Sequence, residues 1–425
     1  MSKYTSLEFF LGVLLLVGTV SLIYPYGFPL FTIVAILYFF VFFINKKVKI
    51  KFNFGFGILY IMITLYFLGI LISANKLYPY NIADIQSIVV LIILFMLMGN
   101  ANYITLKKVT TIYLNFCSII IPILAIYSLY KYALLLNGVK ISKFLIEGRN
   151  YPWGTSLMPD YNMFALGMLI GLLATISKLS ESESVYKQVF YLFATVLIVL
   201  AVIFSGSRRG WILLAISSVY LIYILLRKIF RSSLKSKITF ILTLTLSVVI
   251  GIVILSKSSL EITNQYELEK LQYRYSTLEN LGESLSSRTS MWDYTLEIIR
   301  DYSVLNYIIG DGFNYIEQYG KKFNNPNGYT YPHNILISTF HYSGGVGVIL
   351  LLVLLVKPYI LYINNKSLIP SNLILMYTLC LLFLLVSGNS FFSINILWLT
   401  VTIIIVGIQR REIDKNEESY IHCSK

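Results

Sequence analysis

The chain has little charge for its length. Of its 425 residues, only 13% are Asp, Glu, Lys or Arg, whereas 57% are hydrophobic. A soluble globular domain contains about 25% charged residues. The shortage excludes a protein that exposes most of its surface to water, and the hydrophobic excess is typical of a membrane protein.

Cysteine and metal-binding patterns are scarce as well. The three cysteines, Cys117, Cys380 and Cys423, have neither the spacing of a metal site nor that of a disulfide framework. The sequence contains no D-x-D or H-x-x-E motif and no glycine-rich nucleotide-binding loop, and the turn at 24–28 has no acidic residue. We therefore expect neither a cofactor nor a metal ion in the chemistry of this chain.

Long apolar runs recur along the whole chain. A transmembrane helix needs about 20 mostly apolar residues, and these runs predict an all-α polytopic membrane protein with about twelve transmembrane helices. The runs lie at 7–24, 28–44, 57–73, 82–99, 109–130, 161–177, 188–205, 211–226, 238–255, 335–356, 372–388 and 391–408. The short run at 211–226 is the weakest of them. No cleavage site follows the first run, which we interpret as a retained helix.

The basic residues lie in short clusters between the apolar runs. The clusters occupy the connections 45–56 and 227–237 and the tail from 409. The turns at 25–27 and 389–390 have no basic residue. Because cytoplasmic loops are rich in Lys and Arg, both termini are predicted to be cytoplasmic. The net charge of +14 then reflects topology and contact with the anionic lipid bilayer, and it does not indicate nucleic-acid binding.

This orientation divides the chain into four predicted parts. Residues 1–255 hold helices 1–9, with an outer loop near 131–160. Residues 256–334 form one large outer loop domain between helices 9 and 10, residues 335–408 hold helices 10–12, and residues 409–425 form a cytoplasmic tail.

One outer turn breaks this charge rule. The sequence SGSRRG at 205–210 places Arg208 and Arg209 on the face where basic residues are otherwise sparse. The arginines would either snorkel to lipid phosphates or grip a phosphate ligand bidentately, while the glycines let the backbone approach. We favour the anion site because the turn opposes the topology signal.

A histidine stands at the end of the large outer loop. The sequence YTYPHN at 329–334 places His333 directly before the helix predicted from 335. With an unperturbed pKa of about 6.5, His333 would accept a proton from a hydroxyl at the membrane surface, or it would simply end the loop. His341, about 80° around the helix from His333, would face the bundle as a packing residue.

The same loop contains SSRTSMW at 286–292, which opens an amphipathic helix predicted to reach about residue 300. Arg288, in its first turn, would point toward a lipid-linked phosphate or would be solvated. The turn GDGF follows at 310–313, and a lone G-x-G is weak evidence for any site.

The first outer loop leads into the sequence PDYNMFA at 159–165. Asp160 is predicted to cap the helix that follows, because an aspartate side chain accepts hydrogen bonds from the first free backbone amides. Asn162 is expected to make a polar contact in the first turn.

Together these motifs resemble a known family. An S-x-S-R-R-G turn, an R-T-x-x-W helix, a G-x-G turn and P-H-N before a G-G-x-G helix occur in this order between Pro159 and Gly347. The set is similar to the O-antigen ligase/O-antigen polymerase superfamily of bacterial membrane glycosyltransferases. The flanking helices match that superfamily only in being hydrophobic.

The resemblance implies a GT-C-like protein of twelve helices in the bacterial cell (inner) membrane, with its active site on the outer face. Such proteins take a glycan from an undecaprenyl-pyrophosphate carrier and pass it to an acceptor hydroxyl without a metal ion. By this resemblance Arg208, with Arg209 beside it, and Arg288 would bind the pyrophosphate, and His333 would activate the acceptor. Further substrate contacts are expected from motif residues Asn334, Ser207, Trp292 and Asn162.

The implied chemistry is physically coherent. Pyrophosphate is a good leaving group, so the site needs mainly positive charge and one base within about 3 Å of the acceptor hydroxyl. A direct displacement of this kind would invert the anomeric centre. The shared motifs do not separate a polymerase of repeat units, which we favour slightly, from a ligase that joins the glycan to lipid A-core.

Two other classes of protein remain as alternatives. A lipid-linked glycan flippase or transporter would also have about twelve helices, but transporters often show internal repeats and mid-membrane charges. A polysaccharide-binding scaffold would need sugar-facing aromatic residues but not the set of arginines and histidine. The sequence leaves open whether a chain-length regulator binds.

Overall fold

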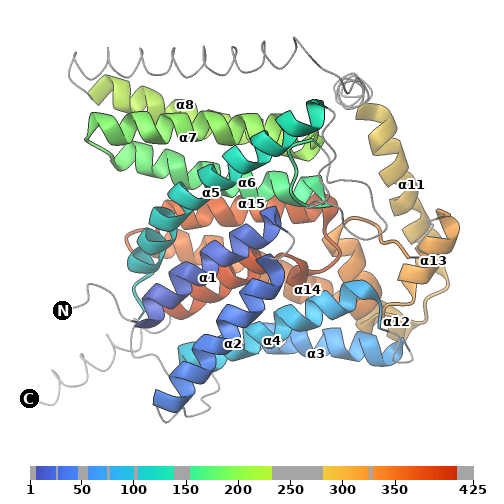
Figure 1. Ribbon diagram of the computed structural model, residues 1–425. Coiled ribbons are helices and arrows are strands. Elements are labelled where there is room, and N and C mark those ends of the chain that lie inside the picture. Colours follow the sequence, from blue (N-terminus) through green and yellow to red (C-terminus); the bar gives the residue numbers. More distant parts are fainter. Residues whose placement is uncertain are drawn as a thin grey trace, which may run out of the picture. The chain divides into compact units, whose positions relative to one another are not determined.

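The structure is a computed structural model, and it describes residues 6–24, 27–45, 56–73, 77–99, 104–137, 154–231, 281–324 and 329–408 (Figure 1). These residues form helices, turns and short connections, and no β-strand occurs among them. They fall into two compact units. Unit 1 takes Met1–Phe10, Thr32–Val109 and Leu281–Lys425, and unit 2 takes Leu11–Phe31 and Thr110–Asn280.

The helices follow the predicted apolar runs. They are α1 (Ser6–Ile23), α2 (Gly27–Asn45), α3 (Gly57–Ile72), α4 (Pro79–Gly99), α5 (Leu106–Leu136), α6 (Tyr161–Glu181), α7 (Val185–Ile203), α8 (Arg208–Arg231), α14 (Ile335–Asn364), α15 (Ser371–Ser387) and a last helix at Asn395–Ile408. Within the described part of the chain, six helices are long and apolar enough to cross a membrane, and four shorter apolar helices accompany them. The chain is therefore an all-α multi-pass membrane protein. The predicted run at 238–255 lies outside the described residues, so the count of twelve spans stays a prediction.

In unit 2, the helices α6, α7 and α8 pack side by side (Figure 1). Most of α6 is buried, and close packing on α5 requires a small residue at one point. A Cβ atom added to Gly171 would lie 2.3 Å from the Cγ2 of Ile121. Small residues of this kind let membrane helices approach each other closely.

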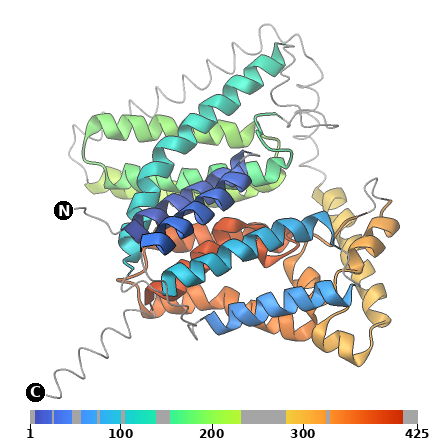
Figure 2. The same cartoon turned by 60° about the horizontal axis from the view of Figure 1, so that its bottom comes forward.

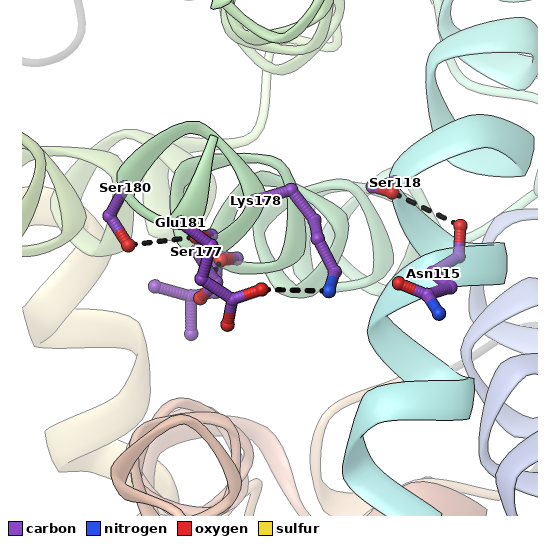
Figure 3. Close-up of polar contacts among 7 residues, drawn as sticks. Asn115, Ser118, Ser177, Lys178, Ser180 and Glu181 are labelled. Atoms are coloured by element: carbon purple, nitrogen blue, oxygen red, sulfur yellow. Dashed lines mark hydrogen bonds and ion pairs between the residues drawn. The ribbon is translucent and has the colours of Figure 1, made fainter. Parts of the chain in front are cut away.

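Both ends of α6 are fixed by polar side chains. At the first end, Asp160 Oδ1 accepts hydrogen bonds from the amides of Asn162 and Met163 at 2.9 and 3.4 Å. This confirms the predicted cap. At the other end, Lys178 Nζ lies 2.8 Å from Glu181 Oε2 (Figure 3), where a cation is favoured by the negative end of the helix dipole.

In unit 1, the predicted outer loop contains three helices: α11 (Leu281–Arg300), α12 (Val304–Ile309) and α13 (Tyr315–Lys322). Helix α11 thus begins earlier than the helix predicted from 286. Figures 1 and 2 show the three helices gathered beside one end of α14, and α12 packs directly on α14. The part of the predicted loop domain at 256–280 lies outside the described residues.

The GDGF turn at 310–313 docks these outer helices onto the membrane helices of unit 1. Gly310 and Gly312 have positive φ angles of 89° and 69°, and α14 is kinked at Gly344, where φ is 62°. The amide of Asp311 donates to the carbonyl of His341 at 2.7 Å, and the amide of Phe313 donates to the hydroxyl of Ser73. Three glycines in a conformation that other residues rarely adopt therefore allow two backbone segments to meet. The G-x-G turn accordingly has a packing role.

Candidate functional site

The two arginines of the SGSRRG turn begin helix α8. Arg208 is the first residue of the helix, and Gly206, just before it, has a φ of 68°. Ser207 caps the helix, because its Oγ accepts a hydrogen bond from the amide of Gly210 at 2.9 Å. Both arginines are half-buried. A helix N-terminus concentrates partial positive charge and free backbone amides, and two guanidinium groups add to it, so this end of α8 favours an anion.

The predicted substrate contacts Ser207 and Asn162 are bonded to each other. Ser207 Oγ donates to Asn162 Oδ1 at 2.9 Å, and the two residues are 45 positions apart in the chain. This bond holds the start of α8 against the start of α6. It fixes the arginine turn in place, whatever further contact either residue makes with a substrate.

A buried lysine, which the sequence analysis did not single out, supports the same turn. Lys131, near the end of α5, is fully buried, and its ammonium group donates to the carbonyls of Gly154 and Ser156 at 3.0 and 2.5 Å. Between these two residues, the amide of Thr155 donates to the carbonyl of Phe204 at 3.2 Å. Lys131 thus holds the 154–156 segment against the residue that precedes the SGSRRG turn. Its signal in the sequence was an isolated lysine within the apolar stretch at 127–136, where an ionisable residue is uncommon.

His333 has an unusual backbone conformation. Its φ angle is 54°, which is uncommon for a residue with a side chain and costs conformational energy. The imidazole is half-buried, and its ring centroid lies 4.4 Å from that of Tyr331. Asn334 begins α14 as its cap and accepts from the amides of Leu336 and Ile337 at 2.9 and 3.2 Å.

Helix α11 is tied to the same P-H-N segment. Trp292 Nε1 donates to the carbonyl of Pro332 at 3.0 Å, directly beside His333. Arg288 lies four residues before Trp292 in the same helix, and positions four apart share a helix face. The fold of unit 1 therefore places position 288 and His333 on adjoining elements, joined by the tryptophan.

Aromatic side chains anchor the outer helices to α14. His341 is fully buried, as its predicted packing role requires. Its Nδ1 is hydrogen-bonded to Tyr302 Oη at 2.7 Å, and its ring stacks on Tyr315 at 4.8 Å between centroids. Burial raises the pKa of the phenols of Tyr302 and Tyr319, so both stay neutral hydrogen-bonding groups at physiological pH.

A carboxylate inside the membrane helices of unit 1 was also missed. Asp84 in α4 is buried, and its Oδ2 accepts from Tyr66 Oη of α3 at 2.9 Å. The same Tyr66 oxygen accepts from Asn81 Nδ2 at 2.9 Å. Tyr66 also contacts the ring of Phe313 in the GDGF turn, at 5.0 Å between centroids. Through Tyr66, this polar network contacts the turn that docks the outer helices.

The predicted site residues fall into two groups, one in each unit. Unit 2 carries Arg208 and Arg209 with Ser207 and Asn162, and unit 1 carries Arg288, Trp292, His333 and Asn334. In the described ranges, no group of three His, Cys, Asp or Glu side chains is placed to hold a metal ion. Each part provides what phosphate chemistry needs: guanidinium groups in the first, and an imidazole beside an arginine-bearing helix in the second.

A comparison with known families matches part of the chain. Residues 193–352 match the family model described as O-antigen ligase. This part of the chain is similar to the O-antigen ligase family. The match confirms the resemblance drawn from the motifs. Neither the curated proteins nor the solved structures contain a significant match.

The O-antigen ligase domain includes both arginines of the turn, Arg288 and His333. Its bounds also include Ser207, Trp292 and Asn334, whereas Asn162 and Lys131 lie before it. Members of this family are membrane enzymes of the glycosyltransferase type that act on lipid-linked glycans. The match therefore supports a function of the general O-antigen ligase/polymerase type.

Proposed function

We propose that this protein is a metal-independent, inverting glycosyltransferase that polymerises lipid-linked repeat units of a surface polysaccharide. The donor is an undecaprenyl-pyrophosphate-linked glycan, and the acceptor is a hydroxyl group of another lipid-linked glycan. The observation that carries the proposal is the left-handed His333, held between a capped helix and the tryptophan of α11. A strained backbone at a proton-accepting residue is characteristic of functional sites.

The proposed reaction is a single displacement. The acceptor oxygen forms a bond to the anomeric carbon of the donor as the bond from that carbon to the pyrophosphate oxygen breaks. The pyrophosphate leaves with the electron pair, and Arg208, Arg209 and Arg288 stabilise its charge. The proton of the acceptor hydroxyl passes to His333. Attack from the side opposite the leaving group inverts the anomeric centre.

The reaction requires the half-buried arginines to act where little water competes. A charge interaction between guanidinium and phosphate is several times stronger near a protein surface than in bulk water. The helix N-terminus of α8 and the buried ammonium of Lys131 add positive potential from groups that the fold already holds in place. These features support pyrophosphate as the leaving group.

The test uses the full chain in lipid nanodiscs, with the undecaprenyl-pyrophosphate repeat unit of the host as substrate and EDTA throughout. We expect a ladder of longer lipid-linked glycans and release of undecaprenyl pyrophosphate. Arg208→Ala, Arg288→Ala and His333→Ala should each lower the rate by about 100-fold or more. Arg300→Ala, which changes an exposed arginine on the same helix as Arg288, and His422→Ala should keep the wild-type rate.

The other functions give different results in this assay. Transfer that begins only after lipid A-core is added would assign the protein as a ligase. Movement of the lipid-linked glycan across the bilayer without any change in its size would assign it as a flippase. Wild-type rates in all three site variants would refute the proposed site.

A further inference from the structure

The outer helices of unit 1 line an open cavity that the proposed displacement does not use. It has a volume of about 390 Å³ and lies among α11, α12 and α13, within the range of roughly 300–1,000 Å³ that is usual for small-molecule sites. Its walls hold tyrosines, carboxylates and amides. The cavity lies on α11 beyond Trp292, toward the C-terminal end of that helix.

Acidic groups dominate the charge of the cavity. Glu297, Asp301 and Asp311 line it. Asp311 Oδ1 accepts a hydrogen bond from Asn306 Nδ2 at 3.2 Å, and Glu297 forms an exposed ion pair with Lys322 at 3.1 Å. Asp301 and Asp311 do not take part in that ion pair, so their negative charge would repel an anionic ligand.

The remaining wall groups suit a ligand rich in hydroxyls. Gln318 lines the cavity, and its buried side-chain carbonyl oxygen accepts no hydrogen bond from the described residues. A buried acceptor of this kind is normally satisfied, so it calls for a donor such as a hydroxyl group. Tyr294 and Tyr302 offer flat apolar faces beside these polar groups.

We propose that this cavity binds a neutral or amino-substituted sugar of the glycan, next to the sugar that reacts. Carboxylates and amides would accept from its hydroxyls, and the tyrosine rings would cover its apolar face. The naming of the ligand as part of the transferred glycan rests on the proposed function. The position of the cavity supports this role, because Tyr302 joins it to α14 through His341 and α11 joins it to the P-H-N segment through Trp292.

The binding test uses the full chain in nanodiscs and the repeat-unit oligosaccharide released from its lipid carrier by mild acid. Saturation-transfer NMR gives the dissociation constant and the sugar that lies closest to the protein. We expect Asp301→Asn and Gln318→Leu to weaken binding about tenfold, and a sugar without carboxylate or phosphate to receive the strongest saturation. Asp301 is exposed, so its replacement leaves folding intact.

The matched control is Asp293→Asn, an exposed aspartate on the same helix that does not line the cavity. It should bind the oligosaccharide as the wild type does. Wild-type affinity in both cavity variants would overturn the proposal. Strongest saturation on an acidic sugar would overturn it as well.

A second readout separates this proposal from the proposed function. In the transfer assay, Asp301→Asn should raise KM for the lipid-linked glycan about tenfold with kcat within about twofold. The wild type could transfer no glycan and still bind the oligosaccharide, with weaker binding in Asp301→Asn. In that case the proposed function fails and the proposed sugar site stands. If transfer requires His333 while the cavity variants keep wild-type KM and affinity, the function stands and the cavity fails.

Discussion

At the scale of single residues, His333 offers a test that separates strain from chemistry. Its φ of 54° suits glycine better than any residue with a Cβ atom. His333→Gly should therefore be about 1 kcal/mol more stable than His333→Ala, although both variants lose the proposed base and should lose transfer. Thermal unfolding of the two variants in the same nanodiscs measures the difference. Equal stability would mean that the backbone at 333 is not strained.

Lys131 allows a second residue-scale prediction. Replacement of Lys131 by Met keeps the length of the side chain but leaves the buried carbonyls of Gly154 and Ser156 without their donor. We expect a loss of about 2–4 kcal/mol in the free energy of unfolding, together with a loss of transfer, because the 154–156 segment supports the arginine turn. Lys187→Met, at an exposed position of α7, is the control and should change neither quantity. Retained transfer in the destabilised Lys131→Met protein would separate Lys131 from the site.

The polar roles that depend on local sequence could be predicted, and those that depend on packing could not. Asp160 is a cap because the amides it binds lie two and three residues away. The bond between Ser207 and Asn162 spans 45 residues, and it arises only when α6 and α8 pack together. Lys131 lay at the edge of an apolar run, where its carbonyl partners, 23 and 25 residues away, have no signature in the sequence.

At the scale of elements, the docking of α11–α13 depends on the glycines of the GDGF turn. A Cβ atom on Gly310, whose φ is 89°, would lie 2.4 Å from the amide nitrogen of Ser343. Gly310→Ala should therefore cost about 3 kcal/mol and release the outer helices from α14. Limited proteolysis within 281–324 and thermal unfolding measure both effects.

Gly345 provides the matched control for this element. A Cβ atom there would meet only the carbonyl of Tyr307, at an ordinary 3.4 Å, and alanine is favoured over glycine in a helix. Gly345→Ala should resist protease as the wild type does. Equal protease resistance in the Gly310→Ala protein would show that the turn does not hold the outer helices.

The apolar runs predicted most membrane helices because their length and hydrophobicity are local properties. The helices at 304–309 and 315–322 were not predicted, since they are short and are fixed by tertiary contacts such as the stacking of Tyr315 on His341. Helix α11 was predicted but begins five residues earlier than expected, because helix starts are the least determined part of a sequence pattern.

At the scale of the whole molecule, the division into units follows no sequence boundary. Unit 1 collects residues from the first ten positions, from 32–109 and from 281 onward, and unit 2 takes the stretches between them. Hydropathy gives the spans one by one but not their neighbours, because lipid is as apolar as the helices that pack within it.

The predicted orientation of the molecule is the last requirement of the proposed function, since the arginine turn and the P-H-N segment must share the outer face. The test begins from a protein in which Cys117, Cys380 and Cys423 are replaced by Ser. Asp293→Cys places a thiol at an exposed position of α11, and Lys187→Cys places one at an exposed position of α7. Position 187 ends the connection 178–187, which is predicted to be cytoplasmic when both termini are cytoplasmic.

A membrane-impermeant maleimide should then label position 293 in intact cells with an accessible inner-membrane surface. It should label position 187 only after the membrane is opened, which serves as the control for intactness. The reverse pattern would place the outer helices in the cytoplasm. By the predicted topology, the turn with Arg208 and Arg209 would then be cytoplasmic too, where the positive-inside rule favours basic residues. In that case the position of the two arginines would follow the charge rule, and it would no longer indicate an anion site.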